Sequence, residues 1–147
     1  MISNNGFGER RFIVQEIIKF LQENNAGCFA TVQQGQPQIR PWQFQFELDG
    51  KFYFGTANTK KVYQQLKETP CAAFASFSPT MATVRMTGQV VFDSSPQMKA
   101  MVLERNKMLQ NIYGTSDNPD PSFEVFYLCN GEASYTEYGK EPVVYKF

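Results

Sequence analysis

A short basic segment carries the clearest chemical signal in the sequence. Lys60 and Lys61 follow the apolar run 52–57 and stand where a short helix is expected to begin. A helix N-terminus already carries a partial positive charge, so lysines in the first turn are unfavourable unless an anion binds there. Backbone N–H groups, two ammonium groups and the hydroxyls of Thr56 and Thr59 would together bind a phosphate. The alternative is a pair of solvated surface lysines, the commonest use of this residue.

A further positive charge is expected on the preceding strand. Between residues 40 and 48 apolar and polar side chains alternate, and Arg40 falls in the same series as Trp42 and Phe44. A guanidinium on this apolar face needs a carboxylate or a ligand anion as its partner, unless it reaches solvent from the strand end. Pro41 has no N–H for a sheet ladder, so it predicts an edge, a bulge or a ligand lying along the strand.

The dipeptide Asp49-Gly50 predicts a tight hairpin between this strand and the strand 52–56. The two strands would then be antiparallel neighbours, with the hairpin at one end of both. Arg40 would therefore lie beside the segment Thr56–Lys61 at the other end. Two separate indications of an anion site converge on one rim of the sheet.

The overall composition favours a β-rich fold and one domain. The 147 residues suit a single domain over 1–147, with 1–9 expected as a flexible tail. Aromatic residues make up 15% of the chain and include 14 Phe, which suits strands better than a helical bundle. Lysine and arginine balance aspartate and glutamate at 14 each, so we expect no nucleic-acid partner and no attraction to an anionic membrane.

Histidine is absent, which excludes Ser-His-Asp and Cys-His catalytic sites, His-ligated zinc and haem with a proximal histidine. No metal site and no catalytic acid or base is expected. Cys28, Cys71 and Cys129 lie far apart in strand-like runs, and we expect them to be buried and reduced. The first residues lack a signal-peptide pattern and no apolar run approaches a membrane span, so the expected location is the cytoplasm.

The remaining pattern predicts short antiparallel strands with a few helices. Helices are expected over 10–24, from about 60 to 69 and, after a Ser95 cap and Pro96, to about 110. Further strands are expected over 28–32, 71–77, 83–92, 123–129, 133–138 and 143–147, with a second hairpin at Asn130-Gly131 and a polar loop over 114–121. Arg85 is expected on the solvent face. Together these elements predict a mainly β fold, a closed or split antiparallel barrel.

The ordered set of motifs resembles a known family. The segments Gly35–Pro41, Phe52–Val62 and Val84–Val90 resemble the FMN-binding split barrels related to pyridoxamine 5′-phosphate oxidase. The ending over 123–144 is similar to the small bacterial, nitroimidazole-resistance-like branch. The resemblance spans nearly the whole chain and rests on the set of segments rather than on any one motif.

The resemblance implies a homodimer with two FMN molecules at its interface. It implies that Thr59, Lys60 and Lys61 bind the FMN phosphate and that Arg40 supports the cofactor. It further implies that the strand 40–45 runs along the flavin ring, and that the next strand ends near the flavin and its phosphate. The cofactor contacts implied on these two strands are Pro41, Trp42, Gln43, Gln45, Gly55 and Thr56.

The resemblance does not extend to the reaction of pyridoxamine phosphate oxidase itself. Gln45 stands where those enzymes carry a lysine, and their C-terminal substrate-binding segment has no counterpart here. We therefore expect an FMN-dependent oxidoreductase that exchanges a hydride with a nicotinamide or small organic substrate. The alternative is a non-catalytic protein that binds a flavin or deazaflavin for storage or sensing.

Overall fold

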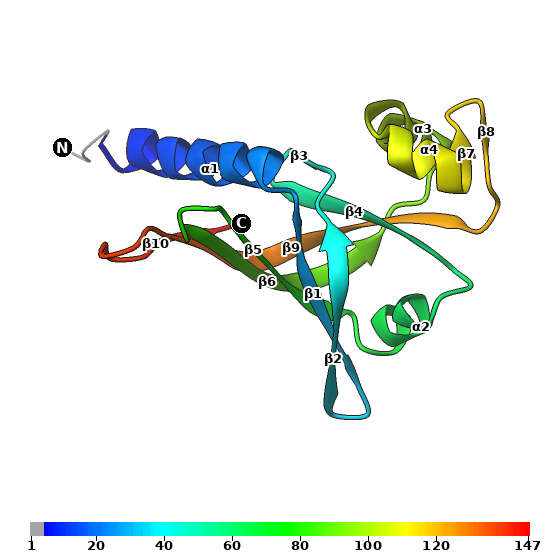
Figure 1. Ribbon diagram of the computed structural model, residues 1–147, viewed down its shortest axis with the longest axis horizontal. Helices are drawn as coiled ribbons and strands as arrows, with labels where there is room; N and C mark the ends of the chain where they lie inside the picture. Colours follow the sequence, from blue (N-terminus) through cyan, green and yellow to red (C-terminus); the bar gives the residue numbers. More distant parts are fainter. Residues whose placement is uncertain (1–4) are drawn as a thin grey trace.

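The computed structural model describes residues 5–147 and is organised around one strongly curved antiparallel sheet (Figure 1). The helices are α1 (Asn5–Glu23), α2 (Lys61–Glu68), α3 (Pro96–Arg105) and α4 (Lys107–Tyr113). The strands are β1 (Ala26–Gln33), β2 (Gln36–Gln43), β3 (Phe46–Leu48), β4 (Lys51–Ala57), β5 (Cys71–Phe77), β6 (Thr83–Phe92), β7 (Gly114–Thr115), β8 (Asn118–Pro119), β9 (Phe123–Thr136) and β10 (Val143–Lys146).

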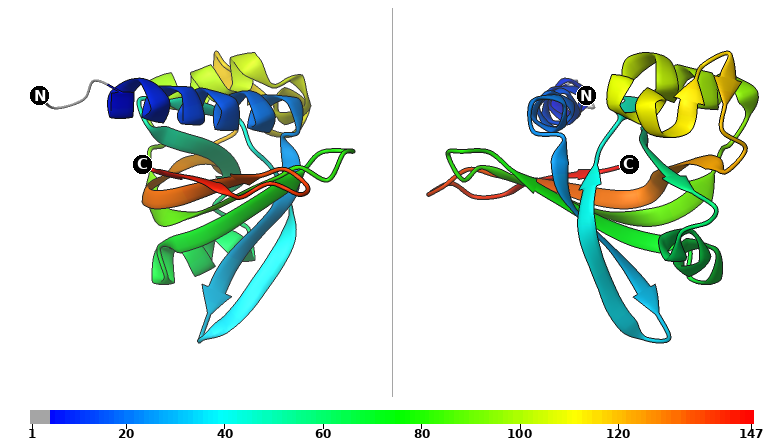
Figure 2. Two further views of the ribbon diagram at one scale, coloured as in Figure 1. Left: turned by 90° about the vertical axis from the view of Figure 1, so that its left-hand side faces the viewer. Right: turned by 45° about the vertical axis from the view of Figure 1, so that its right-hand side comes forward.

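The main sheet has the order β2-β1-β5-β6-β9-β4-β3, and β10 pairs with β9. Its two ends, β2 and β3, are consecutive in the chain and are joined by a bend at residues 44–45. The sheet therefore curls back on itself, yet β2 pairs with β1 alone and the barrel stays open between its end strands β2 and β3. This arrangement confirms the expected split barrel (Figure 2).

Aromatic side chains fill the inside of the curl. Phe54 lies 5.3 Å from Phe29 and 5.7 Å from Phe126 between ring centroids, and all three rings are fully buried. Ile17 and Leu21 of α1 belong to the same cluster. A second cluster lies under α3 and α4 on the opposite side of β4; it includes Phe46, Tyr53, Val102, Leu103 and Phe123. β4 therefore contributes side chains to both clusters and separates them.

Several local predictions are confirmed. The Asp49-Gly50 turn joins β3 to β4, with φ angles of 52° and 76° at its two residues. Ser95 caps α3 by accepting a hydrogen bond from the backbone N–H of Met98, with proline in the first turn. Arg85 is exposed, as expected for a residue on the outer face.

The predicted continuous strand over 40–48 is wrong, because the chain bends after Gln43. The backbone N–H of Phe44 donates to Asn25 O at 2.8 Å, whereas that of Gln45 donates to Tyr53 O at 3.0 Å. The chain thus changes its neighbour from the β1 side to β4 within one residue. Phe44 consequently joins the inner aromatic cluster while Phe46 joins the cluster under α3 and α4.

The predicted hairpin at Asn130-Gly131 is also wrong. β9 runs through these residues as one strand and pairs with β6 on both sides of them, with a register shift between Thr87 and Gln89. Asn130 has a φ of 48°, so its turn-like conformation is accommodated as a bulge rather than as a chain reversal. A Cβ on Gly131 would lie 2.0 Å from Thr87 O, which explains why glycine stands there.

Three further expectations differ from the structure. The helix expected to end near residue 110 is broken at Asn106, and its second part, α4, continues to Tyr113. The polar loop over 114–121 contains the small β7–β8 ladder. Of the expected tail over 1–9, residues 5–9 begin α1, and the rest lies outside the described residues.

The cysteines are less buried than expected. Cys28 and Cys71 are exposed and Cys129 is half-buried, and all three are free thiols. Cys28 and Cys71 occupy outward positions on their strands, where small side chains gather. None of the helices within residues 5–147 is long and apolar enough to cross a membrane.

Candidate functional site

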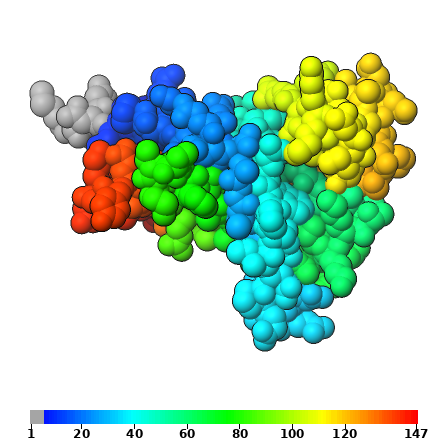
Figure 3. Space-filling view, in the orientation of Figure 1, coloured from blue at the N-terminus to red at the C-terminus, as the bar shows by residue number. Residues whose placement is uncertain are grey.

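A cavity of about 470 Å³ lies where the barrel is split. One side is formed by the β2–β3 bend, the end of β4 and the start of α2, through Pro41, Trp42, Gln43, Gln45, Gly55 and Lys60. The other side is formed by Ala26 and by one face of α4, through Met108, Leu109, Ile112 and Tyr113. On the surface, β2 (cyan), α2 (green) and α4 (yellow) lie around this region (Figure 3).

The strand side of the cavity combines a free sheet edge with a large ring. β2 is the last strand of the sheet order, so no neighbouring strand covers its outer edge. Pro41 lies on this edge strand, which confirms the edge prediction. Trp42 packs on Phe29 at 5.6 Å between ring centroids and is itself half-buried. A flat ligand could therefore contact both backbone groups and an aromatic surface here.

Lys60 brings positive charge to the mouth of the cavity. Its Nζ lies 5.6 Å from the Trp42 ring centroid and 5.8 Å from that of Tyr113. Lys60 is also the N-cap position of α2, where no side chain caps the helix and no acidic residue follows in the first turn. Thr59 and Lys61 are exposed beside it. Two cations and uncapped N–H groups thus share one helix start, as an anion site requires.

Arg40 lies next to α2 and is bound by neutral groups. Its guanidinium donates to Thr31 Oγ1 at 2.8 Å, to Gln65 Oε1 at 2.8 Å and to Phe29 O at 3.4 Å. No carboxylate among residues 5–147 forms an ion pair with it. Burial lowers the pKa of the Arg40 guanidinium from its ordinary value. Of the partners considered from the sequence, the carboxylate is absent, and the positive charge stays unneutralised within the described chain.

Thr56 differs from the other predicted residues because its side chain is almost completely buried. Only 1% of the residue is exposed, and its hydroxyl has no hydrogen-bond partner among the described residues. Buried hydroxyls nearly always have a hydrogen-bond partner, so an unpartnered one is unusual. Thr56 directly follows Gly55, which lines the cavity, so the alternation of β4 turns its side chain to the opposite face of the strand. The exposed groups at the start of α2, Thr59, Lys60 and Lys61, are therefore the ones that fit a bound anion.

The predicted site residues divide into two groups. Pro41, Trp42, Gln43, Gln45, Gly55 and Lys60 meet at the cavity. Thr59 and Lys61 lie beside it at the start of α2, while Arg40 and Thr56 lie behind these residues in the protein. The hairpin was expected to place Arg40 beside Thr56–Lys61 through pairing of its strand with β4, but β2 pairs with β1 instead. Arg40 reaches α2 through Gln65, and Lys60 lies near Trp42.

Sequence reasoning missed the α4 side of the cavity. The helix expected to about residue 110 includes Met108 and Leu109 but was assigned no site residue, and Ile112 and Tyr113 lie beyond its expected end. The spacing of these four residues, with pairs separated by four positions, places them on one face of a helix. That spacing was visible in the sequence, but the break at Asn106 that turns this face toward β2 was not.

The cavity lining limits the chemistry that the protein itself can perform. The lining residues include no carboxylate and no thiol, and Lys60 and Tyr113 are the titratable groups among them. Residues 5–147 also contain no cluster of acidic, histidine or cysteine side chains suited to a metal ion. An apolar, aromatic cavity with cations at its mouth is typical of a binding site for a planar, phosphorylated organic molecule.

Comparison with known proteins identifies the family. The family model described as pyridoxamine 5′-phosphate oxidase matches residues 13–135. A NimC/NimA family protein from Clostridium acetobutylicum is similar in structure, with 30% sequence identity, a TM-score of 0.80 and coverage of 89% of this chain and 90% of that chain. No curated protein sequence matches the chain significantly.

Two more distant solved structures share the fold. One is a pyridoxamine 5′-phosphate oxidase-related, FMN-binding protein from Nostoc punctiforme PCC 73102, with 20% identity, a TM-score of 0.70 and coverage of 97% of this chain and 88% of that chain. The other is a haem-binding protein from Mycobacterium smegmatis, with 18% identity, a TM-score of 0.67 and coverage of 84% of this chain and 53% of that chain. Because the family model spans most of the sequence, the chain belongs to the pyridoxamine 5′-phosphate oxidase family.

Proposed function

We propose that the protein binds FMN in the cavity between β2, α2 and α4 and uses it as an oxidoreductase. The observation that carries this proposal is the meeting of Trp42, Gln45, Gly55 and Lys60, from separate elements, around one largely apolar cavity. The FMN-binding description of a neighbour with the same fold supports the choice of cofactor.

The residues present fit the two chemical halves of FMN. The ring would lie against Trp42 and the outer edge of β2, where amide and backbone groups can bind its polar rim. The phosphate would lie at the start of α2, bound by Thr59, Lys60 and Lys61. Thr56 and Arg40 would support this end of the site from behind.

FMN, when bound, supplies the hydride-exchanging atom, which the lining residues lack. The protein would bind the cofactor, orient it and exclude water through the apolar residues of α4. The proposed substrate is a nicotinamide or another small organic molecule that stacks on the exposed face of the ring. No acid or base from this chain is required for the exchange.

Purified protein tests this proposal directly. We expect a yellow protein with a flavin spectrum, or a colourless protein that takes up FMN in a titration followed by the fluorescence of Trp42, the single tryptophan. Anaerobic addition of NADH or NADPH should then bleach the flavin. A protein that FMN neither colours nor stabilises against heat would contradict the proposal.

The same experiment separates the enzyme from a binding protein. Bound FMN that reduced nicotinamides and small organic donors leave unbleached would indicate storage or sensing of a flavin. Parallel titrations with a deazaflavin and with haem test the remaining ligands of such a protein. Haem is included because a neighbour with this fold is described as haem-binding, although this chain has no histidine to ligate iron.

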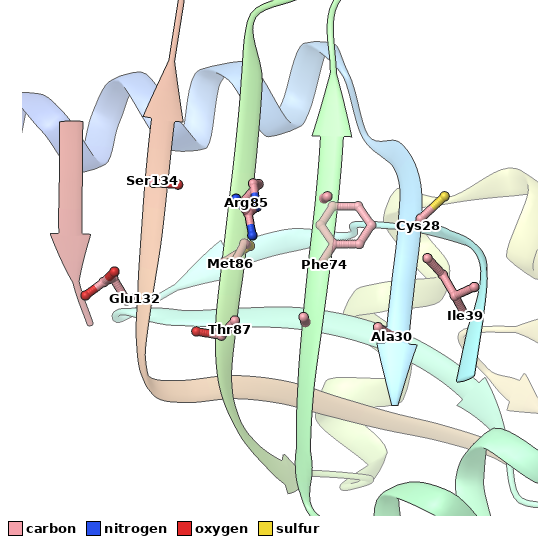
Figure 4. A pocket seen from close by; sticks show the side chains of 11 residues that line it. Cys28, Ala30, Ile39, Phe74, Arg85, Met86, Thr87, Glu132 and Ser134 are labelled. Atoms are coloured by element: carbon pink, nitrogen blue, oxygen red, sulfur yellow. The ribbon is translucent and has the colours of Figure 1, made fainter. Parts of the chain in front are cut away.

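We further propose that residues 1–147 form one domain that assembles as a homodimer through the outer face of the sheet. This face is a shallow concavity of about 350 Å³ with small side chains on neighbouring strands (Figure 4). It includes Cys28, Ala30, Ile39, Ala73 and Ala75, and Ile39 is 71% exposed. Such a surface permits close approach of a second sheet.

The charges on the outer face suit a second copy of the same chain. Arg85 on β6 and Glu132 on β9 line the same concavity and are both exposed. In a two-fold assembly each of these residues can face its opposite from the partner, because an isologous interface brings the same patch against itself. The implied position of FMN at the interface would let the partner complete the cavity.

A further inference from the structure

Asn106 connects the two sides of the candidate cavity through one side chain. Its Oδ1 accepts hydrogen bonds from the backbone N–H groups of Met108 at 3.1 Å and Leu109 at 3.2 Å, which begins α4. Its Nδ2 donates to Gln43 Oε1 and to Gln45 Oε1, both at 2.9 Å. The helix side and the strand side of the cavity are therefore held together by Asn106.

These hydrogen bonds fix, one after another, the orientations of the side-chain amides of Asn106, Gln43 and Gln45. The backbone N–H groups of α4 can only donate, so the oxygen of the Asn106 amide must face the helix. Its nitrogen must then face the glutamines, so each glutamine presents its oxygen to Asn106. The Nε2 groups of Gln43 and Gln45 turn away accordingly and donate to Asn25 Oδ1 at 3.4 Å and Gln43 O at 3.2 Å.

The orientation of these amides determines which hydrogen-bonding groups the cavity presents to a ligand. Gln43 and Gln45 both line the cavity, as do Met108 and Leu109 at the start of α4. One of the two N–H groups of the Gln45 amide is used by Gln43 O. The second one is left to donate to a hydrogen-bond acceptor on a ligand, such as a ring carbonyl.

We propose that Asn106 is a positioning residue for the cavity. It fixes α4 against the β2–β3 bend and keeps Gln45 oriented as a hydrogen-bond donor, so that the site selects rings with acceptors on the facing edge. The effect on the ligand rests on the proposed FMN site, whereas the coupling of α4 to the bend does not.

Two substitutions separate the capping of α4 from the contact with the glutamines. Asn106→Ser keeps a capping oxygen and loses both donors to Gln43 and Gln45. Asn106→Asp also keeps the cap but presents only acceptors, so both glutamines must turn their nitrogens inward and their oxygens toward the ligand. Ser95→Ala is the matched control, because it removes the cap of the neighbouring helix α3 and leaves the cavity untouched.

We expect the FMN dissociation constant to rise about tenfold in Asn106→Ser and about a hundredfold in Asn106→Asp, and to stay within about twofold in Ser95→Ala. The visible circular dichroism of bound flavin should change in both Asn106 variants. In a background with Gln43→Ala and Gln45→Ala, Asn106→Ser should have no additional effect, because its partners are already gone. An undiminished effect in that background would overturn the proposal.

Hydrogen exchange in the ligand-free protein keeps this test independent of FMN. Amides of α4 should exchange several-fold faster in Asn106→Ser than in wild type, because this variant loses the contact with the glutamines. They should be unchanged in Asn106→Asp, which keeps the cap and still binds the turned glutamines, and in Ser95→Ala. Failure of wild type to bind FMN would contradict the proposed function, and these exchange rates would then decide the role of Asn106. Equal exchange rates of α4 in wild type and Asn106→Ser would refute that role.

Discussion

Lys60 and Lys61 are adjacent, yet they stand in different surroundings. Lys60 lies between the rings of Trp42 and Tyr113 and lines the cavity, whereas Lys61 is the exposed first residue of α2. We expect Lys60→Ala and Lys61→Ala each to raise the FMN dissociation constant about 10- to 100-fold, since charge-assisted contacts contribute about 1.5–3 kcal/mol. Equilibrium titration of each variant provides the measurement.

Lys67→Ala is the control for these variants. Lys67 lies in the last turn of the same helix, where it contacts the rings of Tyr63 and Phe92 rather than the cavity. It removes the same charge from α2 and should leave FMN affinity within about twofold of wild type. An equal loss in all three variants would indicate general electrostatic attraction instead of a defined phosphate site.

At the residue scale, the sequence predicted those residues whose role depends only on their immediate neighbours in the chain. Lys60 could be recognised because a cation at a helix start is unfavourable by itself, and Pro41 because it cannot take part in an inner ladder. The surroundings of Arg40 could not be predicted in this way. Its acceptors Thr31 and Gln65 come from β1 and α2, and nothing in the spacing of these residues reveals the contact.

At the element scale, β9 depends on one residue for its continuity past the bulge. Gly131 packs so closely on β6 that a Cβ would lie 2.0 Å from Thr87 O and 2.7 Å from Gly88 Cα. We expect Gly131→Ala to lower the free energy of unfolding by about 2–3 kcal/mol or more, because backbone atoms of both strands must separate. Chemical denaturation monitored by circular dichroism measures this change.

Gly8→Ala is the opposite case and serves as the comparison. Gly8 lies inside α1, and a Cβ added there meets no atom within 4 Å. The same substitution should therefore stabilise the protein by about 0.5–1 kcal/mol through helix propensity. Similar effects at Gly131 and Gly8 would contradict the close packing described for the bulge.

The elements also show where sequence patterns fail. Alternation along 40–48 predicted a strand but not its bend, because Phe44 and Phe46 are both buried and the pattern does not tell one cluster from the other. The glycine after Asn130 predicted a turn, since a bulge and a hairpin require the same local conformation. The pairing partner decides between them, and β6 is about forty residues away in the chain.

At the scale of the whole molecule, the proposed homodimer would assemble through the outer face of the sheet. We expect wild-type protein to be a dimer by size-exclusion chromatography with light scattering. Ala75→Arg should make it monomeric, because Ala75 is exposed in the centre of that face and lies opposite Cys28 and Arg85 in the sheet. A buried unpaired charge at such an interface is costly.

Gln15→Arg adds the same charge to an exposed position of α1 and should leave the dimer intact. If the partner completes the cavity, Ala75→Arg should also weaken FMN binding while Gln15→Arg does not. A wild-type monomer, or a dimer that tolerates Ala75→Arg, would exclude the outer face as the interface. Retention of FMN by a monomeric Ala75→Arg variant would show that cofactor binding does not depend on assembly.

The free edge of β2 has a consequence for the solution behaviour of the protein. A proline fits where its missing N–H would point away from the neighbouring strand, so Pro37 and Pro41 remove donors from the outer edge. An edge with gaps in its donors is a poor template for a strand from another molecule. The edge beside the proposed ligand site is therefore disfavoured for edge-to-edge aggregation.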